Sequence, residues 1–262
     1  MSPSPSKPPQ PFLLVRSADT LFWVHPVARN WAEECLARGV SLHEYAEASS
    51  LERPQGVLHG RGPVHLVEGV EEGERWAVRH FHRGGLLAPL LGDRYLRNRG
   101  LPRPLAEAEA SEHCRERGIS TPQVLAAAVY RRGPVYRGDL VTRYIPESVT
   151  LARLLRSEEA TRPQRLKALE MAGELVRLLE EKGVLHPDLN VKNILFAPAP
   201  EPREIHLLDL DRVRVSEGGP VPGTPMFRRL TRSLRKWEER NGSRLPDSAW
   251  AALHHGWDKK DR

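Results

Sequence analysis

The segment 186–196 constrains the fold of this chain more than any other part of the sequence. It reads His-Pro-Asp-Leu-Asn-Val-Lys-Asn-Ile-Leu-Phe, which places Asp188 five residues before Asn193. A helical pattern that stops at Gly183 precedes it, and an apolar run that ends at Asp209 follows it. The order therefore predicts a helix, a polar loop and two short strands, the second of which ends in an acidic residue.

This order of residues is typical of enzymes that transfer a phosphoryl group from ATP. Such a transfer depends on positioning and on charge neutralisation more than on covalent catalysis. We expect Asp188 to accept a hydrogen bond from the acceptor hydroxyl and to take its proton. We expect Asn193 and Asp209 to coordinate magnesium on the ATP phosphates, and His186 to brace the loop. The alternative is a polar turn that only joins a helix to a strand.

The first half of the chain supplies further candidates for binding ATP. Gly60 and Gly62 lie between two alternating segments, so they form either a turn over the phosphates or an ordinary hairpin turn. A later strand places Arg79 where protein kinases keep the lysine that contacts the α- and β-phosphates. Arginine offers a fixed fork of donors for that role. Its partner should be a glutamate on the next helix, and Glu107 is preferred to Glu109.

The pattern of elements divides the chain into four parts. We predict a disordered tail over 1–11, a helical extension over 12–54, a strand-rich small lobe over 55–145 and a helix-rich large lobe over 146–262 with a basic C-terminal helix. The expected strands and helices are a hairpin over 57–68, strands over 75–81, 124–130, 135–144, 193–196 and 204–210, and helices over 31–38, 42–48, 104–117, 165–182 and 227–240. This order predicts an α+β fold of the bilobal, protein-kinase-like type.

Composition and charge exclude several other classes. The net charge of +6 attracts nucleic acid, anionic membranes and phosphorylated substrates alike. Because no zinc-finger or RNP signature accompanies it, no nucleic-acid partner is expected. No apolar run reaches the roughly 18 residues that a membrane span needs, and the first residues do not resemble a secretory signal.

Several segments resemble one family of bacterial kinases. Their sequences are similar to those of 3-deoxy-D-manno-octulosonic acid (Kdo) kinases, which belong with the lipopolysaccharide core heptose kinases. The similar segments are residues 79–96, which follow the nucleotide-contacting strand, 186–193, which form the catalytic loop, 208–212, which end the metal-binding strand, and 228–236, which are basic. An arginine at position 79 and a second asparagine, Asn190, in the loop also fit that family. The resemblance covers roughly Gly60 to Lys236.

The resemblance implies an ATP- and magnesium-dependent kinase with a sugar hydroxyl, first of all on Kdo, as its acceptor. It places that acceptor in the lipopolysaccharide inner core on a lipid A precursor, and the enzyme in the cytoplasm at the cytoplasmic face of the inner membrane. It also adds Asn190 to the candidate catalytic residues. A heptose, a small-molecule antibiotic or a protein stays open as the acceptor. So does a pseudokinase that only binds a partner, which the departures at Arg79 and in the Asp-Leu-Asp segment favour.

Two groups of basic residues gain a role under this resemblance. A lipid-A-type acceptor lies in an anionic membrane surface, which attracts nearby basic side chains by about 1 kcal/mol each. The groups are Arg83, Arg94, Arg97, Arg99 and Arg103 after the nucleotide-contacting strand, and Arg228, Arg229, Arg232, Arg235 and Lys236 on the basic helix. The alternative for each residue is an ordinary solvated charge.

Overall fold

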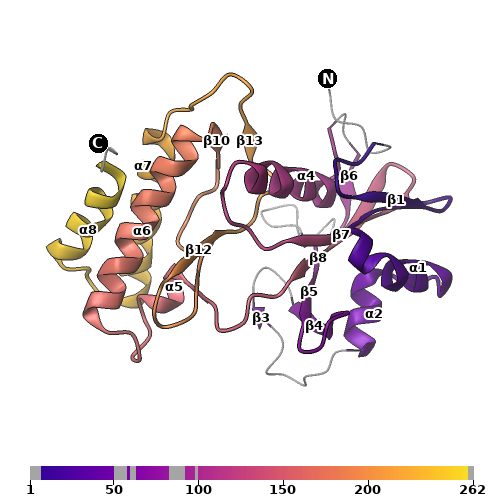
Figure 1. The fold of residues 1–262 in the computed structure, drawn as a ribbon, viewed down its shortest axis with the longest axis horizontal. Coiled ribbons are helices and arrows are strands. Elements are labelled where there is room, and N and C mark those ends of the chain that lie inside the picture. The colour runs from indigo at the N-terminus through magenta and orange to yellow at the C-terminus, as the bar shows by residue number, and fades with distance from the viewer. Residues whose placement is uncertain (1–6, 50–57, 60–62, 83–91, 98–99, 259–262) are drawn as a thin grey trace. The chain divides into compact units, whose positions relative to one another are not determined.

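A computed structural model describes residues 7–49, 58–59, 63–82, 92–97 and 100–258 of the chain (Figure 1). The chain divides into two compact units. The first comprises residues up to 112 together with 122–144, and the second comprises 113–121 together with the residues from 145 onward. Helices and antiparallel strands occur in both units, so the fold is α+β, as the sequence predicts.

One antiparallel sheet forms the first unit. Its strands are β1 (Leu13–Arg16), β2 (Thr20–Val24), β3 (Leu58–His59), β4 (Pro63–Glu68), β5 (Arg75–His80), β6 (Tyr95–Leu96), β7 (Val124–Arg132) and β8 (Val135–Arg143). Their order across the sheet is β1-β2-β7-β8-β5-β4-β3, and β6 pairs with β8 beside this path. The long pair of β7 and β8 therefore lies at the centre of the sheet and joins its two halves.

The segment 12–54, which the sequence predicts to be helical, contributes two of these strands. β1 pairs with β2, and β2 pairs with β7 along its whole length. Within β2 the neighbours Phe22 and Trp23 are both fully buried, so the strand lacks the usual alternation of buried apolar and exposed polar side chains. Such a run occurs where both faces of a sheet are covered, and it carries no period-2 signal. The helical prediction is therefore wrong here, although helices α1 (Arg29–Ala37) and α2 (Leu42–Ser49) follow.

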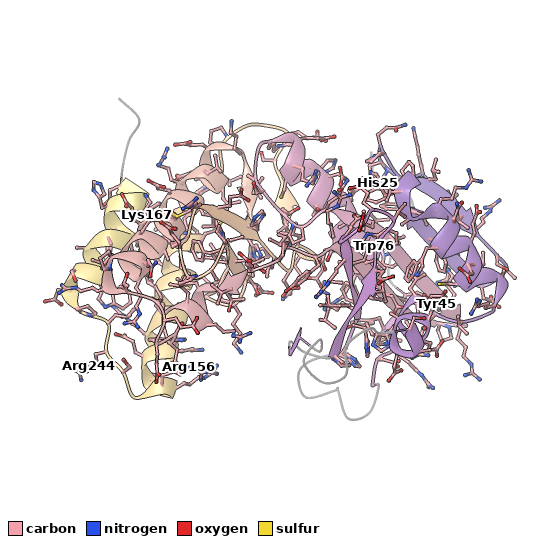
Figure 2. All side chains as sticks on the ribbon, turned by 60° about the horizontal axis from the view of Figure 1, so that its bottom comes forward. His25, Tyr45, Trp76, Arg156, Lys167 and Arg244 are labelled. Atoms are coloured by element: carbon pink, nitrogen blue, oxygen red, sulfur yellow. The ribbon has the colours of Figure 1, made fainter. Side chains whose placement is uncertain are left out.

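Helices cover both faces of this sheet. On one face Trp76 of β5 meets Trp31 of α1 edge to face, with ring centroids 5.8 Å apart. Trp76 belongs to a buried cluster that includes residues of α2, and Tyr45 of α2 packs against this cluster (Trp76 and Tyr45 are labelled in Figure 2). Helix α4 (Arg103–Glu116) contributes to a second buried cluster on the other face. Side chains alternate along a strand, so the neighbours Arg79 and His80 project to opposite faces. Arg79 faces α4, and His80 faces α2.

The second unit combines short strands with longer helices. They are β9 (Val149–Thr150), α5 (Leu151–Leu154), α6 (Arg162–Glu181), β10 (Val184–Leu185), β11 (Ile194–Ala197), β12 (Glu204–Leu207), β13 (Arg214–Val215), α7 (Thr224–Asn241) and α8 (Asp247–Asp258). β10 pairs with β13, and β12, β11 and β9 form a three-stranded sheet. α7 and α8 both pack on α6 (Figure 1).

Helix α6 begins three residues before the predicted start. The side chain of Thr161 accepts a hydrogen bond from the Gln164 main chain, and the Gln164 side chain accepts one from the Thr161 main chain at 2.8 Å. This reciprocal pair satisfies main-chain donors that a helix start leaves open. The helix ends before Gly183, whose φ of 69° is the left-handed conformation that favours glycine.

Glycines allow α6 and α8 to approach closely. A Cβ atom on Gly256 of α8 would lie 2.0 Å from the carbonyl oxygen of Glu170 in α6. A Cβ atom on Gly173 of α6 would lie 2.2 Å from the carbonyl oxygen of Leu253. The two helices are therefore in main-chain contact at both points. The sequence predicts that the basic helix is the C-terminal one. This prediction is wrong, because helix α8, which was not expected, follows the basic helix α7.

Apolar side chains fix one face of α7 to the unit. Met226, Phe227, Leu230, Leu234 and Trp237 are buried, and the basic residues lie on the opposite face. No helix in the described part of the chain is long and apolar enough to cross a membrane.

Candidate active site

The loop with the His-Pro-Asp-Leu-Asn sequence is fixed at both ends by strands. His186 follows β10, which pairs with β13, and Asn193 precedes β11, which pairs with β12 and β9. The main-chain nitrogen of Val191 donates to Ser233 Oγ of α7 at 3.2 Å. The loop is therefore attached to two sheets and to one helix, which restricts its movement.

His186 connects the start of the loop to the end of β12. Its side chain is fully buried, with Nε2 3.1 Å from the carbonyl oxygen of Leu208 and Nδ1 accepting from the Asp188 main-chain nitrogen at 3.2 Å. Burial lowers the pKa of His186, so the neutral ring with its proton on Nε2 fits both contacts. This geometry suits a structural brace rather than an acid or base.

Two asparagines hold the main chain of Asp188. The Nδ2 atoms of Asn190 and Asn193 both donate to the Asp188 carbonyl oxygen, at 2.7 and 3.1 Å. Asn190 Oδ1 also accepts from the Lys192 main-chain nitrogen at 2.9 Å. Asn190 therefore shapes the turn with both ends of its amide. Asn193 uses its Nδ2, so its Oδ1 is the atom that can face a cation.

Asp209 lies beside Asn193 at the end of the β11–β12 pair. The Leu208 main-chain nitrogen donates to the Asn193 carbonyl oxygen at 2.9 Å, and Asp209 follows directly. Its φ of 61° is left-handed, a conformation that costs a residue other than glycine about 1 kcal/mol or more. The chain turns at this residue, and β12 ends at Leu207, three residues before the end of the predicted strand.

The amide oxygen of Asn193 and the carboxylate of Asp209 are hard oxygen donors of the kind that Mg²⁺ prefers. Within the described ranges, His, Cys, Asp and Glu side chains form no cluster of three that could hold a metal ion. Magnesium commonly takes only one or two protein ligands and completes its shell with phosphate and water oxygens. The donor set therefore fits magnesium bound together with a nucleotide.

Two arginines that the sequence did not place in the site contact the Asp188 carboxylate. Arg212 Nη1 lies 2.8 Å from Asp188 Oδ2, and Arg229 Nη1 lies 3.7 Å from Oδ1. The Asp188 side chain is about one-third exposed at 34%. In the sequence, only their positions could have indicated these two arginines as site residues. Arg212 follows Asp209 by three residues, and Arg229 belongs to the basic segment 228–236.

The first unit contains the predicted pair of Arg79 and Glu107. Arg79 Nη2 lies 2.7 Å from both carboxylate oxygens of Glu107, which is buried on α4. The guanidinium also lies over the Phe81 ring, 4.7 Å from its centroid. The structure therefore selects Glu107, rather than Glu109, as the partner of Arg79. A role of this pair in holding ATP stays a prediction.

Several predicted residues lie outside the described part of the chain. Gly60 and Gly62, proposed to contact the ATP phosphates, are among them, and so are Arg83 and Arg99 of the first basic group. The strands that flank the two glycines do pair, with Leu58 and His59 of β3 opposite residues of β4.

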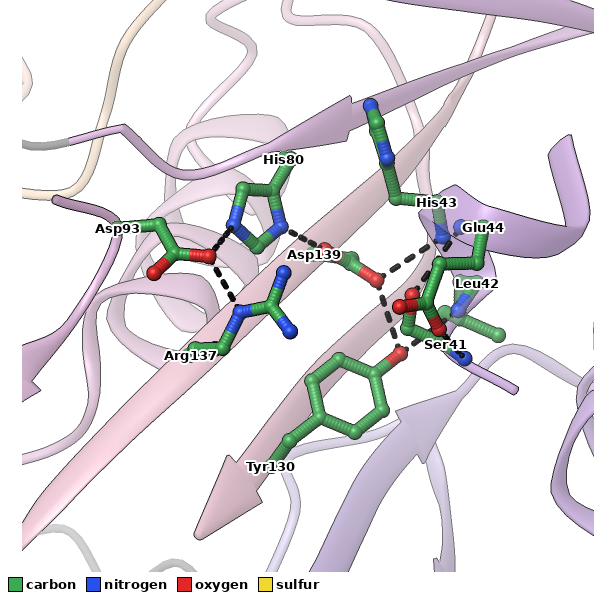
Figure 3. Close-up of polar contacts among 9 residues, drawn as sticks. All are labelled: Ser41, Leu42, His43, Glu44, His80, Asp93, Tyr130, Arg137 and Asp139. Carbon is green, nitrogen blue, oxygen red and sulfur yellow. Dashed lines mark hydrogen bonds and ion pairs between the residues drawn. The ribbon is translucent and has the colours of Figure 1, made fainter. Parts of the chain in front are cut away.

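A buried polar cluster in the first unit was not predicted (Figure 3). His80 lies between two carboxylates, with Nδ1 2.5 Å from Asp139 Oδ1 and Nε2 3.0 Å from Asp93 Oδ2. Asp139 is fully buried and also accepts from the Tyr130 hydroxyl at 2.9 Å and from the His43 main-chain nitrogen at 3.0 Å. The cluster ties β5, β7 and β8 to the start of α2.

Comparison with known proteins gives concordant matches. The model of the lipopolysaccharide kinase (Kdo/WaaP) family matches residues 56–257, which include every candidate site residue. A "3-deoxy-D-manno-octulosonic acid kinase" of Actinobacillus succinogenes is 31% identical over 211 residues, which cover 78% of this chain and 85% of the relative. The protein of the same name from Haemophilus influenzae strain PittEE is 31% identical over 207 residues, covering 77% of this chain and 83% of the relative.

A solved structure shows the same fold. "WaaP in complex with acyl carrier protein" matches with a TM-score of 0.53 and 16% identity, over 95% of this chain and 90% of that chain. This likeness supports the α+β assignment for the whole described chain.

Proposed function

Because this chain belongs to the lipopolysaccharide kinase (Kdo/WaaP) family, we propose that it transfers the γ-phosphoryl group of ATP, with magnesium, to a hydroxyl of Kdo on a lipid A precursor. The family and its relatives make it a kinase that acts on a sugar hydroxyl, which argues against an inactive pseudokinase. The relatives named Kdo kinases favour Kdo over a heptose as the acceptor. The position of Asp188 carries the mechanism: two asparagines hold its main chain, and its carboxylate reaches solvent.

Asp188 acts as the base in this proposal. The acceptor hydroxyl donates a hydrogen bond to the carboxylate, and its oxygen forms a new bond to the γ-phosphorus. The bond from that phosphorus to the bridging oxygen breaks, the electron pair leaves with ADP, and the proton passes to Asp188. A positioned base of this kind contributes roughly 10²- to 10⁴-fold to the rate.

His186, Asn190 and Asn193 position the base. Each contacts the Asp188 main chain, so the carboxylate starts from a fixed point. Positioning matters because a displacement of about 1 Å can lower the rate by roughly 10²-fold. Asn193 Oδ1 and the Asp209 carboxylate would hold magnesium, which neutralises negative charge on the phosphates when it is bound.

The first unit contributes the contact to the nucleotide in this proposal. Glu107 and the Phe81 ring fix the Arg79 guanidinium, which then binds the α- and β-phosphates with little further loss of side-chain freedom. We assign the two units to the small and large lobes of a kinase-like fold. Gly60 and Gly62 stay candidates for contacting the phosphates.

The basic face of α7 supports binding to an anionic membrane surface. The exposed residues of this face are Arg228, Arg229, Arg232, Arg235 and Lys236. Each basic side chain near such a surface contributes about 1 kcal/mol. We propose that the protein lies peripherally on the cytoplasmic face of the inner membrane, where a lipid A precursor presents its sugars.

Transfer of label from γ-labelled ATP to purified Kdo-lipid A tests the function. The wild-type protein should label the lipid, and Asp188→Asn should lower the rate by about 100-fold or more. Glu217→Gln, which changes an exposed acidic residue of the same unit, is the matched control and should keep the wild-type rate.

Two results would contradict the proposal in different ways. Absence of transfer by wild-type protein that still binds magnesium-ATP would exclude Kdo-lipid A as the acceptor and direct the search to a heptose. Equal rates for wild type and Asp188→Asn would exclude Asp188 as the base.

A further inference from the structure

The carboxylate of Asp188 is shared by two arginines from separate elements. Arg212 lies in the turn after β12, which the hydrogen bond from the Val213 nitrogen to the Leu210 oxygen closes at 3.0 Å. Arg229 lies on α7. Arg212 contacts Oδ2 and Arg229 approaches Oδ1, so both carboxylate oxygens face a guanidinium.

The position of Arg229 follows from contacts on either side of it along α7. Met226 Sδ accepts from the His186 main-chain nitrogen at 3.4 Å, and Ser233 Oγ accepts from the Val191 main-chain nitrogen at 3.2 Å. These two bonds attach the helix to both ends of the loop that carries Asp188. Arg229 lies between them, so its approach to the carboxylate is built into the packing.

These ion pairs contribute little to folding. The Arg212 and Arg229 side chains are 60% and 48% exposed. Ion pairs at such exposure contribute only about 0–1 kcal/mol to stability. A competing anion can therefore exchange with Asp188 at small cost.

The acceptor must meet these arginines if Asp188 is the base. Its hydroxyl has to lie about 2.6–3.2 Å from a carboxylate oxygen that already contacts a guanidinium. A neutral sugar offers Arg212 no charged partner in exchange. A sugar acid offers its own carboxylate, which an arginine can bind through two parallel hydrogen bonds.

We propose that Arg212 and Arg229 bind the carboxylate of a sugar-acid acceptor, and that this anion draws Arg212 away from Asp188 and leaves the base to the hydroxyl. The proposal rests on the kinase reaction and the Kdo acceptor proposed above. It makes the two arginines residues that determine specificity, because an acceptor without the carboxylate leaves the base occupied. A phosphate of the lipid is also an anion that an arginine can bind, so the experiment has to separate the two sources.

The test measures kcat/KM for three acceptors with one set of variants. The acceptors are Kdo-lipid A, the same lipid with its Kdo carboxyl reduced to an alcohol, and the same lipid without its lipid A phosphates. The variants are Arg212→Ala, Arg212→Lys and Arg229→Ala. Arg214→Ala on β13 and Arg240→Ala on the last turn of α7 are matched controls with exposed arginines.

We expect carboxyl reduction to lower kcat/KM of the wild type by about 10- to 100-fold, the range for a charged hydrogen bond. Arg212→Ala should lose a similar factor on intact Kdo-lipid A and should then be almost indifferent to carboxyl reduction. Arg229→Ala should lose part of the same discrimination. Arg212→Lys, which keeps the charge without the paired donors, should fall between. The KM for ATP and the melting temperature should stay near wild type in all variants.

Four results would overturn the proposal. The first two are a wild-type kcat/KM that carboxyl reduction does not change, and an Arg212→Ala variant that distinguishes the intact from the reduced acceptor as well as the wild type does. The third is a variant whose only change is a higher KM for ATP. The fourth is a kcat/KM that falls when the phosphates are removed and not when the carboxyl is reduced. Absence of transfer from wild type to any of the three acceptors would overturn the proposed function itself, and this proposal with it.

Discussion

His80 and Asp139 face each other across the paired strands β5 and β8, with His80 Nδ1 2.5 Å from Asp139 Oδ1. The other ring nitrogen of His80 meets the carboxylate of Asp93, which also pairs with Arg137 (Figure 3). A neutral imidazole can donate from only one nitrogen. Two carboxylate partners therefore favour the doubly protonated, positively charged ring.

The charge on His80 predicts a dependence of stability on pH. Burial and the positive charge of Arg137 would lower the pKa of His80, but the hydrogen bonds to Asp139 and Asp93 and the negative charge of Asp139 outweigh them and raise that pKa above 6.5. The folded state thus binds the proton more tightly than the unfolded state. This stabilisation is complete below pH 6.5 and is lost as the pH rises through the folded-state pKa, by about 1.4 kcal/mol for each unit of the shift.

Other titratable groups lie near His80 and have shifted pKa values of their own. Burial and the positive charge of His80 lower the pKa of His82, and burial chiefly lowers that of His43, so the effect of both rings on stability lies mainly below pH 6.5. Burial would raise the pKa of Asp93, but Arg137 and His80 lower it below 3.8, so its contribution is lost only as the pH falls through that lower value. Melting temperatures between pH 6.5 and 9 should therefore fall more steeply in wild type than in His80→Gln. Parallel curves would contradict the charged pair.

Asp139→Asn should destabilise the first unit strongly. The Asp139 carboxylate is fully buried and accepts from Tyr130, from the His43 main chain and from His80. Removing one partner of a buried pair typically costs about 3–5 kcal/mol because it leaves the other charge uncompensated. Urea unfolding measures the loss. The matched control Asp19→Asn changes an exposed aspartate of the same unit and should stay within about 0.5 kcal/mol of wild type.

The sequence predicted the parts of the fold and site that depend on local patterns. The strand with Arg79, the helix with Glu107 and the loop from His186 to Asn193 all show their periodicity or spacing within a few residues. The structure places these elements where the sequence predicts them, with boundaries shifted by a few residues. The chemical roles of these residues are still predictions.

The missed features depend on contacts between distant segments. His80 and Asp139 are 59 residues apart, and only the register of β5 against β8 makes them neighbours. Arg212 meets Asp188 across 24 residues through a turn that no pattern announces. The sequence analysis did not predict helix α8. Its Gly256 lowers helix propensity, and the close approach of α6 that requires a glycine there exists only in the folded chain.

Gly256→Ala should destabilise the contact between α6 and α8. The new Cβ atom would lie 2.0 Å from the Glu170 carbonyl oxygen, and a main-chain atom cannot move aside as a flexible side chain can. Overpacking of this kind typically costs about 1–3 kcal/mol. Gly218→Ala is the matched control, since its Cβ would meet Ser216 Oγ at an ordinary 3.8 Å. Equal melting temperatures for the two variants would show that the helices can separate without cost.

Arg79→Ala should weaken ATP binding and lower stability together. The change removes the guanidinium proposed to bind the phosphates, and it leaves Glu107 buried without the partner that contacts both of its carboxylate oxygens. We expect the KM for ATP to rise about 10-fold or more, as for loss of a charged hydrogen bond. The double variant with Glu107→Gln removes the buried charge as well. It should recover much of the stability while the KM stays high.

The matched comparison for Glu107 is its neighbour on the same helix. Glu107→Gln should raise the KM for ATP because it releases the Arg79 fork, whereas Glu109→Gln should not. A rise in KM that follows Glu109 instead would contradict the assigned pair. Recovery of the KM along with the stability in the double variant would limit Arg79 to a structural role.

Reversal of charge on the exposed face of α7 should weaken binding to anionic vesicles. We would change Arg228, Arg232, Arg235 and Lys236 to glutamate and leave Arg229, which contacts Asp188, unchanged. Losing about 1 kcal/mol for each attraction should lower the partition coefficient by roughly 100-fold or more in vesicle sedimentation at low salt. Reversal of Arg240 and Arg244, exposed residues at and beyond the C-terminal end of the helix, is the control. Sedimentation that is unchanged by the α7 reversal, or equally reduced by the control, would exclude this face as the membrane contact.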